Sequence, residues 1–251
     1  MHSRRREATG RSASLGASGG GRFARGVQAA AIVTGAGLVV LHLCQLGLAL
    51  AAAEALPAAL GLALGVLAAD ALTGAVHWAC DTWGDERLPW IGASVIRSFH
   101  EHHRAPRDML GSDWIDVNGQ PAVAACLVLA VLALPPLAGR LGEHPLLHAF
   151  LVALAGTGAL ANQLHQWAHT TTPPCWVRRL QRGGWILSPA RHAPHHRPPH
   201  TSHYCISGGW LNRPLDALGF WRALERAITR LTGTRPRAGS DAAGGPAPST
   251  R

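Results

Sequence analysis

The chain has 251 residues, of which 47% are apolar, and a formal net charge of +9. This length suits one ordinary domain, and the apolar residues are numerous enough to fill a core. All 23 basic residues are arginine, but they flank apolar segments instead of lining a helix face between aromatic side chains, so no nucleic-acid-binding protein is indicated. The five cysteines form no C-x2-C pair, which gives no support for a disulfide framework or a zinc ribbon.

Four apolar segments predict a membrane bundle. Residues 1–26 are rich in Arg, Gly and Ser and have no apolar period, so this stretch is predicted to be disordered. The first apolar segment is longer than the roughly 7 to 15 residues typical of a cleaved signal peptide, which favours an uncleaved helix. A spanning helix needs roughly 20 residues. The spans are predicted at about 27–50, 56–76, 121–137 and 145–164.

The arginines predict which side of the membrane each segment faces. Four spans place the N-terminus, residues 77–120 and everything after 165 on one face, which holds 22 of the 23 arginines, whereas the opposite loops hold Arg140 alone. By the positive-inside rule, the arginine-rich face is cytoplasmic. We therefore predict an all-α, multi-pass membrane protein: a four-helix bundle with a cytoplasmic histidine-rich helical cap, and, from the lysine-free composition, a bacterial inner-membrane location.

Two polar features lie outside the loops. Asp70 interrupts the second span, where a carboxylate is costly, so it marks either a functional site or a helix-packing position. Asp70, His77 and Asp81 share one helical face.

Residues 215–231 have an amphipathic period, which fits a helix in the headgroup layer or a helix packed on the cap. Residues 27–232 would form the membrane domain and 233–251 a disordered tail.

Nine histidines from four segments fall on the predicted cytoplasmic face. A mononuclear site uses at most about four protein nitrogens, so nine imidazoles favour two metal ions. Histidines four residues apart on a helix share a face, and an H-x2-HH run can direct adjacent rings to different ions. The nine candidates are His77, His102, His103, His165, His169, His192, His195, His196 and His200.

The identity of the metal is argued from the setting. Imidazole suits iron, zinc, copper and nickel alike. At the mouth of a membrane bundle, however, a lipid chain presents unactivated C–H bonds, which call for an oxidant made from O2 at iron. Nearby carboxylates and amides would orient the imidazole N–H groups, and Asp81 and Asn162 are also candidates for direct or water-mediated ligands. The candidates for this role are Asp81, Glu101, Asp113, Asp116, Asn118 and Asn162.

The motifs HWACDTWG, FHEHHRAP, DVNG, NQLHQWAH, HAPHH and HYCISGGWLNRPLDALGFWRALE resemble the plasmanylethanolamine desaturase family, also called Kua or CarF. The resemblance runs from about Asp70 to Arg237. It implies an O2-dependent di-iron enzyme that introduces the vinyl ether double bond into the sn-1 alkyl chain of an ether phospholipid, converting plasmanylethanolamine to plasmenylethanolamine. It also implies that the nine histidines are the iron ligands, with Asp81 beside them. His100 and His203 receive no ligand role.

The resemblance leaves several alternatives open. A plastid relative desaturates an acyl chain, so an acyl-phospholipid desaturase or a membrane di-iron hydroxylase remains possible. Two electrons per turnover must come from an external ferredoxin or cytochrome b5-type donor, because the chain has no haem-binding segment and no iron–sulfur cysteine spacing. A metal or haem transporter, the alternative that is not an enzyme, should carry ligands within its spans and on both faces, whereas the candidates here cluster on one.

Overall fold

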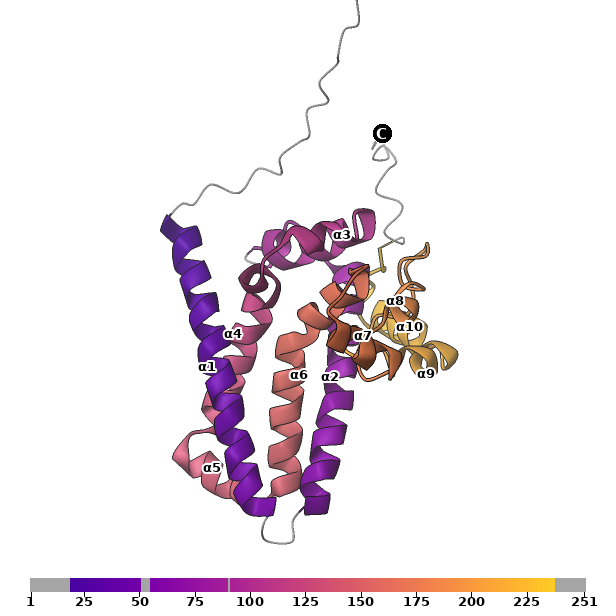
Figure 1. Ribbon diagram of the computed structural model, residues 1–251. Helices are drawn as coiled ribbons and strands as arrows, with labels where there is room; N and C mark the ends of the chain where they lie inside the picture. The colour runs from indigo at the N-terminus through magenta and orange to yellow at the C-terminus, as the bar shows by residue number, and fades with distance from the viewer. Residues whose placement is uncertain (1–18, 51–54, 90, 238–251) are drawn as a thin grey trace, which may run out of the picture.

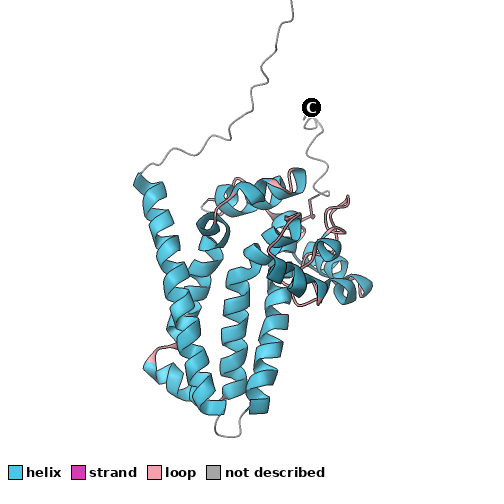
Figure 2. Ribbon diagram, in the orientation of Figure 1, coloured by secondary structure: helices cyan, strands magenta, loops and turns pink. Residues whose placement is uncertain are grey.

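The computed structural model describes residues 19–50, 55–89 and 91–237. Four long helices run side by side: α1 (Gly19–Leu50), α2 (Ala55–Trp83), α4 (Trp114–Leu132) and α6 (Pro145–His169) (Figure 1). Each contains a stretch long and apolar enough to cross a membrane. The described residues contain helices and loops but no strand (Figure 2). The prediction of an all-α protein with four membrane-length helices is confirmed.

Shorter helices complete the molecule. At the end of the bundle shown uppermost in Figure 1 lie a π-helical turn (Gly92–Ile96), α3 (Arg97–Arg104) and a 3-10 turn (Asp108–Gly111). At the opposite end, α5 (Pro135–Gly142) joins α4 to α6. The cap beside the upper part of α2 consists of α7 (Cys175–Arg182), α8 (Pro189–His192), α9 (Asn212–Ala217) and α10 (Phe220–Thr232).

The predicted bounds of the third span are wrong. The segment predicted at 121–137 is helical from Trp114 to Leu132, because the Asp113 carboxylate caps the helix two turns earlier by accepting hydrogen bonds from the amides of Ile115 and Asp116. Pro135 and Pro136, expected to end this span, instead begin α5, where their missing N–H groups cost nothing.

Pro121 lies within α4, and a residue of another helix compensates for it. A proline cannot donate to the carbonyl four residues earlier, which here belongs to Val117. In the membrane such an unpaired carbonyl is costly. The side-chain amide of Asn162 on α6 donates to the Val117 oxygen at 3.1 Å. Asn162 therefore binds α6 to α4 at the point where the α4 ladder is broken.

The predicted disordered ends also need correction where the structure describes them. Residues 19–26 form the first turns of α1, and residues 1–18 lie outside the described part. After α10 ends at Gly233, the chain turns back to α2, where the Arg237 amide donates to the Thr82 carbonyl at 2.9 Å. The rest of the predicted tail, 238–251, lies outside the described residues.

Glycines allow α2 and α6 to approach closely. A Cβ atom added at Gly61 would lie 2.2 Å from the Leu146 carbonyl oxygen, and one at Gly65 would lie 2.3 Å from the Phe150 oxygen. Such small residues let helix backbones pack directly in a membrane. This contact holds the two helices whose upper ends carry most of the bundle's candidate ligands in a fixed register.

The cap is attached to α2 through Asp70. One carboxylate oxygen accepts hydrogen bonds from the amides of Gly208 and Gly209, at 2.8 and 2.9 Å, and the other accepts from Leu211 at 3.2 Å. Asp70 is fully buried, so these donors compensate for its desolvation. Of the two interpretations left open by the sequence, the structure favours the packing role.

The amphipathic segment at 215–231 packs on the cap. It is divided at Gly219, whose φ of 61° ends the turn after α9 and starts α10. Trp221 stacks on Trp78 of α2 with ring centroids 5.7 Å apart, and Ile228 packs against the same group. Leu231 remains 85% exposed. The apolar face is thus largely used inside the protein.

Candidate metal centre

Two groups of side chains converge at the end of the bundle nearest the cap. The ligand atoms within each group all lie within 4.8 Å of one another. The five-histidine cluster consists of His102, His165, His169, His192 and His196. The Asp81 cluster consists of His77, Asp81, His103 and His195.

The spanning helices supply ligands because they continue beyond their predicted ends. The second span was predicted to end at 76, but α2 continues to Trp83 and carries His77 and Asp81 on its last turns. In the same way α6 continues past 164 to His169. His165 and His169 therefore sit on a rigid helix, one turn apart and facing the same side. This extension fixes four of the nine cluster members relative to the membrane bundle.

Adjacent histidines divide between the clusters. His102 and His103 are neighbours on α3, yet their ring centroids lie 6.0 Å apart and each belongs to a different cluster. His195 and His196, at the end of the H-x2-HH run, diverge in the same way, with centroids 5.4 Å apart. The clusters are thus neighbours connected by two pairs of consecutive residues, the arrangement expected of a dinuclear site.

The five-histidine cluster presents its Nε2 atoms to one another. The separations are 2.8 Å between His165 and His192, 2.9 Å between His192 and His196, and 3.3 Å between His165 and His169. Adjacent ligands of one octahedral ion with metal–nitrogen bonds of ~2.1 Å lie about 3.0 Å apart. The cluster is therefore already contracted to a size that suits a single ion.

Backbone carbonyls determine the tautomers in the Asp81 cluster. Nδ1 of His77 lies 3.1 Å from the Tyr204 carbonyl, and Nδ1 of His195 lies 2.8 Å from the Ser202 carbonyl. A carbonyl only accepts, so each Nδ1 carries the proton and each Nε2 presents a lone pair. These two Nε2 atoms, together with Oδ1 of Asp81, are buried without a hydrogen-bond partner. Such a set of unpaired acceptors fits a bound cation.

Burial keeps several of the cluster histidines neutral. Desolvation, followed by the neighbouring imidazoles, lowers the pKa of His192 and of His102 far below the ordinary value, and it lowers the pKa of His196 to about 3. For His195, desolvation and the His103 ring lower the pKa as well. Metal ions bind the neutral imidazole. At physiological pH these rings are therefore in the form that a metal requires.

His200 lies beside the Asp81 cluster but outside both groups of converging ligand atoms. Its ring centroid is 4.6 Å from that of His103, and it is buried. Its backbone has a φ of 59°, which turns the chain sharply after the proline pair. His100 and His203, which received no ligand role, contact carboxylates elsewhere: His100 lies 2.9 Å from Glu86 and His203 2.7 Å from Asp216.

Of the six residues expected to orient the ligands, Asp81 lies in a cluster and the others have different surroundings. Asp113 and Asp116 form ion pairs with Arg25 of α1. Asn162 compensates for Pro121, as described above. Asn118 binds Gln163 at 3.1 Å, and Glu101 is exposed. Their proximity to histidines in the sequence does not bring these five residues into the clusters.

The carbonyls of Ser202 and Tyr204 are the contacts that the sequence does not reveal. Main-chain atoms carry no residue-type signal, so only the fold shows that they orient His195 and His77. Tyr204 is buried, its ring centroid lies 5.3 Å from that of His195, and desolvation raises the pKa of its phenol. The nearest sequence signal was the tyrosine itself, the only one in the chain.

Comparison with known proteins assigns these features to a family. The lipid desaturase domain matches residues 66–239, from the middle of α2 to just beyond α10, and so includes every member of both clusters. The chain belongs to the lipid desaturase family. The candidate metal centre therefore lies inside the domain that defines this family, whereas α1 lies outside the matched region.

Three curated relatives of this lipid desaturase show how far the similarity extends. The chain is 41% identical to plasmanylethanolamine desaturase 1 of Mus musculus, over 71% of this chain and 68% of the relative. It is 38% identical to plasmanylethanolamine desaturase of Myxococcus xanthus, over 69% and 61%. It is 35% identical to the chloroplastic fatty acid desaturase 4 of Arabidopsis thaliana, over 74% and 55%. No solved structure gives a significant match.

Proposed function

We propose that the protein is an O2-dependent di-iron lipid desaturase that introduces the vinyl ether double bond into the sn-1 alkyl chain of an ether phospholipid. The support is the 41% and 38% identity to two plasmanylethanolamine desaturases, from a mammal and a bacterium. The observation that carries the proposal is the pair of adjacent clusters at one end of a membrane bundle. Two ion-sized sites beside a lipid phase suit oxidation of an aliphatic chain.

In this proposal the five-histidine cluster holds one iron and the Asp81 cluster holds the other. Iron with O2 supplies the oxidant that can break an unactivated C–H bond, which side chains alone cannot provide. The chain's own residues position and insulate the ions: the carbonyls of Tyr204 and Ser202 keep His77 and His195 in the binding tautomer. His200, next to His103, is the remaining candidate and would complete the ligand set around the Asp81 cluster.

An open cavity of about 590 Å³ leads to the five-histidine cluster. Its lining includes His169, His192 and His196 and also Arg107. A guanidinium beside the ligands suits the phosphate of a phospholipid, because arginine binds phosphate oxygens in a planar, bidentate manner. We infer that the substrate headgroup lies here while its chain remains in the membrane.

The electron donor is proposed to be an acidic ferredoxin or cytochrome b5-type protein on the cytoplasmic side. Exposed arginines on the cap would attract such a partner over a distance set by salt screening. They include Arg178, Arg182, Arg197, Arg213, Arg222 and Arg226. Turnover at sub-saturating donor should fall severalfold between low and physiological salt. Turnover that is independent of salt would contradict docking by these arginines.

The deciding experiment is lipid analysis of a bacterial host that lacks vinyl ethers, fed an alkylglycerol, with and without this gene. New acid-labile ether lipid would establish the proposed reaction. The 35% identity to fatty acid desaturase 4 favours one alternative, an acyl-phospholipid desaturase, which would produce an unsaturated acyl chain and no acid-labile lipid. A hydroxylated product would identify a hydroxylase. A host with no lipid change but altered metal content would favour a transporter.

A further inference from the structure

An apolar cavity of about 440 Å³ lies between α1, α4 and α6, and the proposed reaction does not use it. Small residues keep it open, among them Gly35 on α1, Ala122 on α4 and Gly156 on α6. Its size is within the ~300–1,000 Å³ of typical ligand sites. Because all three helices have membrane-spanning stretches, the cavity opens within the lipid phase.

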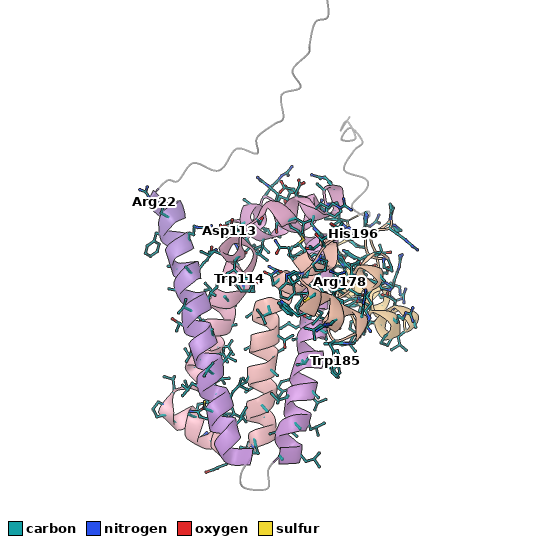
Figure 3. The ribbon with its side chains drawn as sticks, in the orientation of Figure 1. Arg22, Asp113, Trp114, Arg178, Trp185 and His196 are labelled. Carbon is teal, nitrogen blue, oxygen red and sulfur yellow. The ribbon has the colours of Figure 1, made fainter. Side chains whose placement is uncertain are left out.

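The cavity and the metal centre lie on opposite sides of α6. Gly156 and Leu160 line the cavity, and Gln163 continues their face one turn further. His165 follows two residues later, about 200° around the helix, and faces the clusters. Figure 3 shows Trp114, at the cavity mouth, on the α1 side of α6 and His196 on the cap side. A molecule in the cavity is therefore separated from the metals by a helix.

Asn118 gives the cavity one polar feature. Its side-chain nitrogen donates to the Trp114 carbonyl at 3.0 Å and to Oε1 of Gln163 at 3.1 Å. Both partners are acceptors, so the orientation of the amide is determined. Its oxygen, Oδ1, is buried and has no hydrogen-bond partner, and Asn118 is only 2% exposed. A buried acceptor of this kind calls for a donor, which an occupant of the cavity can supply.

The depth of the cavity matches one lipid chain. Trp114 and Asn118 line the cavity in the first turns of α4, and Leu129 lines its far end, so the part of the cavity below Asn118 extends over eleven residues. At ~1.5 Å per residue this is about 17 Å, close to the ~15 Å of one leaflet's hydrocarbon. Beyond Leu129, its carbonyl accepts a hydrogen bond from His42, which is also bonded to His148 at 2.9 Å. This polar contact lies beyond the apolar lining of the cavity.

We propose that this cavity binds a single-chain lipid whose chain head carries a hydroxyl group. The aliphatic chain fills the space between α1, α4 and α6, and the hydroxyl donates to Oδ1 of Asn118. One chain is expected because the part of the cavity below Asn118 is the length of one leaflet and Asn118 presents one unpaired polar atom. The site does not depend on the metals, so it goes beyond the proposed reaction. Its occupant would fasten α1, which lies outside the family domain, to the desaturase core.

The test uses hexadecan-1-ol and hexadecyl methyl ether, which differ in the hydroxyl donor. Delipidated protein in detergent is titrated with each, and binding is followed by native mass spectrometry and by the rise in Tm that a ligand for the folded state produces. The alcohol is expected to bind about tenfold more tightly, the usual effect of one buried hydrogen bond. Equal binding of the two compounds would overturn the proposal.

Two glycines on α6 provide a pair of variants that test where the lipid binds. A Cβ at Gly156 would make an ordinary contact, 3.8 Å from Val39, so the Gly156→Leu side chain fits and extends into the cavity. A Cβ at Gly158 meets nothing within 4 Å, and Gly158 does not line the cavity. We expect G156L to weaken alcohol binding at least tenfold and G158L to leave it unchanged. Equal effects, or none from G156L, would refute the site.

Two further arms complete the experiment. Asn118→Ala should abolish the preference for the alcohol over the ether while the chain still binds. If this variant does not fold, the G156L and G158L pair still decides the question. A lysophospholipid with the same chain, which carries its hydroxyl beside the chain head, distinguishes the natural source: binding equal to that of the alcohol identifies a lysolipid, and weaker binding identifies a free long-chain alcohol. Binding of neither compound would overturn the proposal.

Discussion

Replacing Asp70 with alanine should strongly destabilise the protein, because it leaves three amides without an acceptor, two of them buried and the third partly buried. These belong to Gly208, Gly209 and Leu211, at 2.8, 2.9 and 3.2 Å from the carboxylate. Each unpaired buried N–H costs about 1–3 kcal/mol, so the total is roughly 3–9 kcal/mol. For a chain of this size, that lowers Tm by at least about 6 °C.

The asparagine variant separates a structural from a catalytic role. Asp70→Asn keeps one oxygen for the two glycine amides and loses the bond to Leu211, at a cost of about 1–3 kcal/mol or a few degrees in Tm. Thr73→Val is the control for a change at the same contact between α2 and the cap: it removes the 3.0 Å hydrogen bond to the Asp70 carbonyl and the 3.3 Å contact with Ser207, and it leaves the carboxylate contacts of Asp70 in place. Thermal unfolding in detergent gives Tm, and iron content and turnover are measured on the same samples.

Two results would refute this reasoning about Asp70. The first is an alanine variant with a Tm within 2 °C of that of the unmodified chain, since about 1 kcal/mol corresponds to that shift. The second is an asparagine variant that folds normally and binds iron normally but loses turnover per iron by about 100-fold, the effect expected of a proton-transfer group. That second outcome would restore the functional interpretation of this intramembrane carboxylate.

Three more predictions concern the clusters and the bundle. Purified protein should hold about two metal ions per chain by plasma mass spectrometry. The variant His103→Ala should hold about one, because the five-histidine cluster stays intact. A ratio near one in the unmodified chain contradicts the dinuclear assignment. His102→Ala, His165→Ala and His196→Ala should each abolish product while the protein remains in the membrane, and activity retained in all three would remove them from the site. Gly65→Ala should lower Tm by roughly 2–10 °C, because its Cβ meets the Phe150 oxygen at 2.3 Å. The control Gly37→Ala should leave Tm unchanged, because a Cβ at Gly37 meets nothing within 4 Å. Equal Tm values for the two variants would refute the close helix contact.

Histidine spacing indicated which imidazoles come together because it reports local geometry. His165 and His169 needed only a helix to share a face, and the adjacent pairs needed only consecutive side chains that diverge. The five residues expected to orient the ligands fared differently. Their placement depends on which helix lies opposite: Arg25 pairs with Asp113, and Pro121 in α4 creates the carbonyl that Asn162 satisfies. Such pairings between distant segments leave no periodic signal.

Span bounds were predicted less well than the spans themselves, for a related reason. Hydropathy fell at the polar residues before Pro121, which suggested a later start for α4. In the structure those residues are helical because Asp113 caps the first turn and its neighbours face polar partners on α1. Composition measures the lipid-facing part of a helix, whereas its ends are determined by caps and by contacts with other helices.

One face of α2 explains how the cap sets the chemistry of the Asp81 cluster. Asp70, Gly74, His77 and Asp81 recur at steps of four, three and four residues, so they form one stripe along the helix. At its lower end Asp70 binds the 208–211 turn. One turn higher, Gly74 leaves room for the cap loop at Cys205, since a Cβ there would lie 2.6 Å from Sγ of Cys205.

The next contact along the stripe is the one that matters for metal binding. With this loop held against α2, the carbonyl of Tyr204 reaches Nδ1 of His77, so that Nε2 carries the free lone pair and belongs to the Asp81 cluster. The lower end of this stripe thus attaches the cap to α2, and its upper end supplies members of the Asp81 cluster. Asp70 lies two helical turns from His77, yet it influences the metal site because it holds the cap loop in place and thereby positions the Tyr204 carbonyl. Loss of the Asp70 carboxylate should therefore reduce both Tm and iron occupancy.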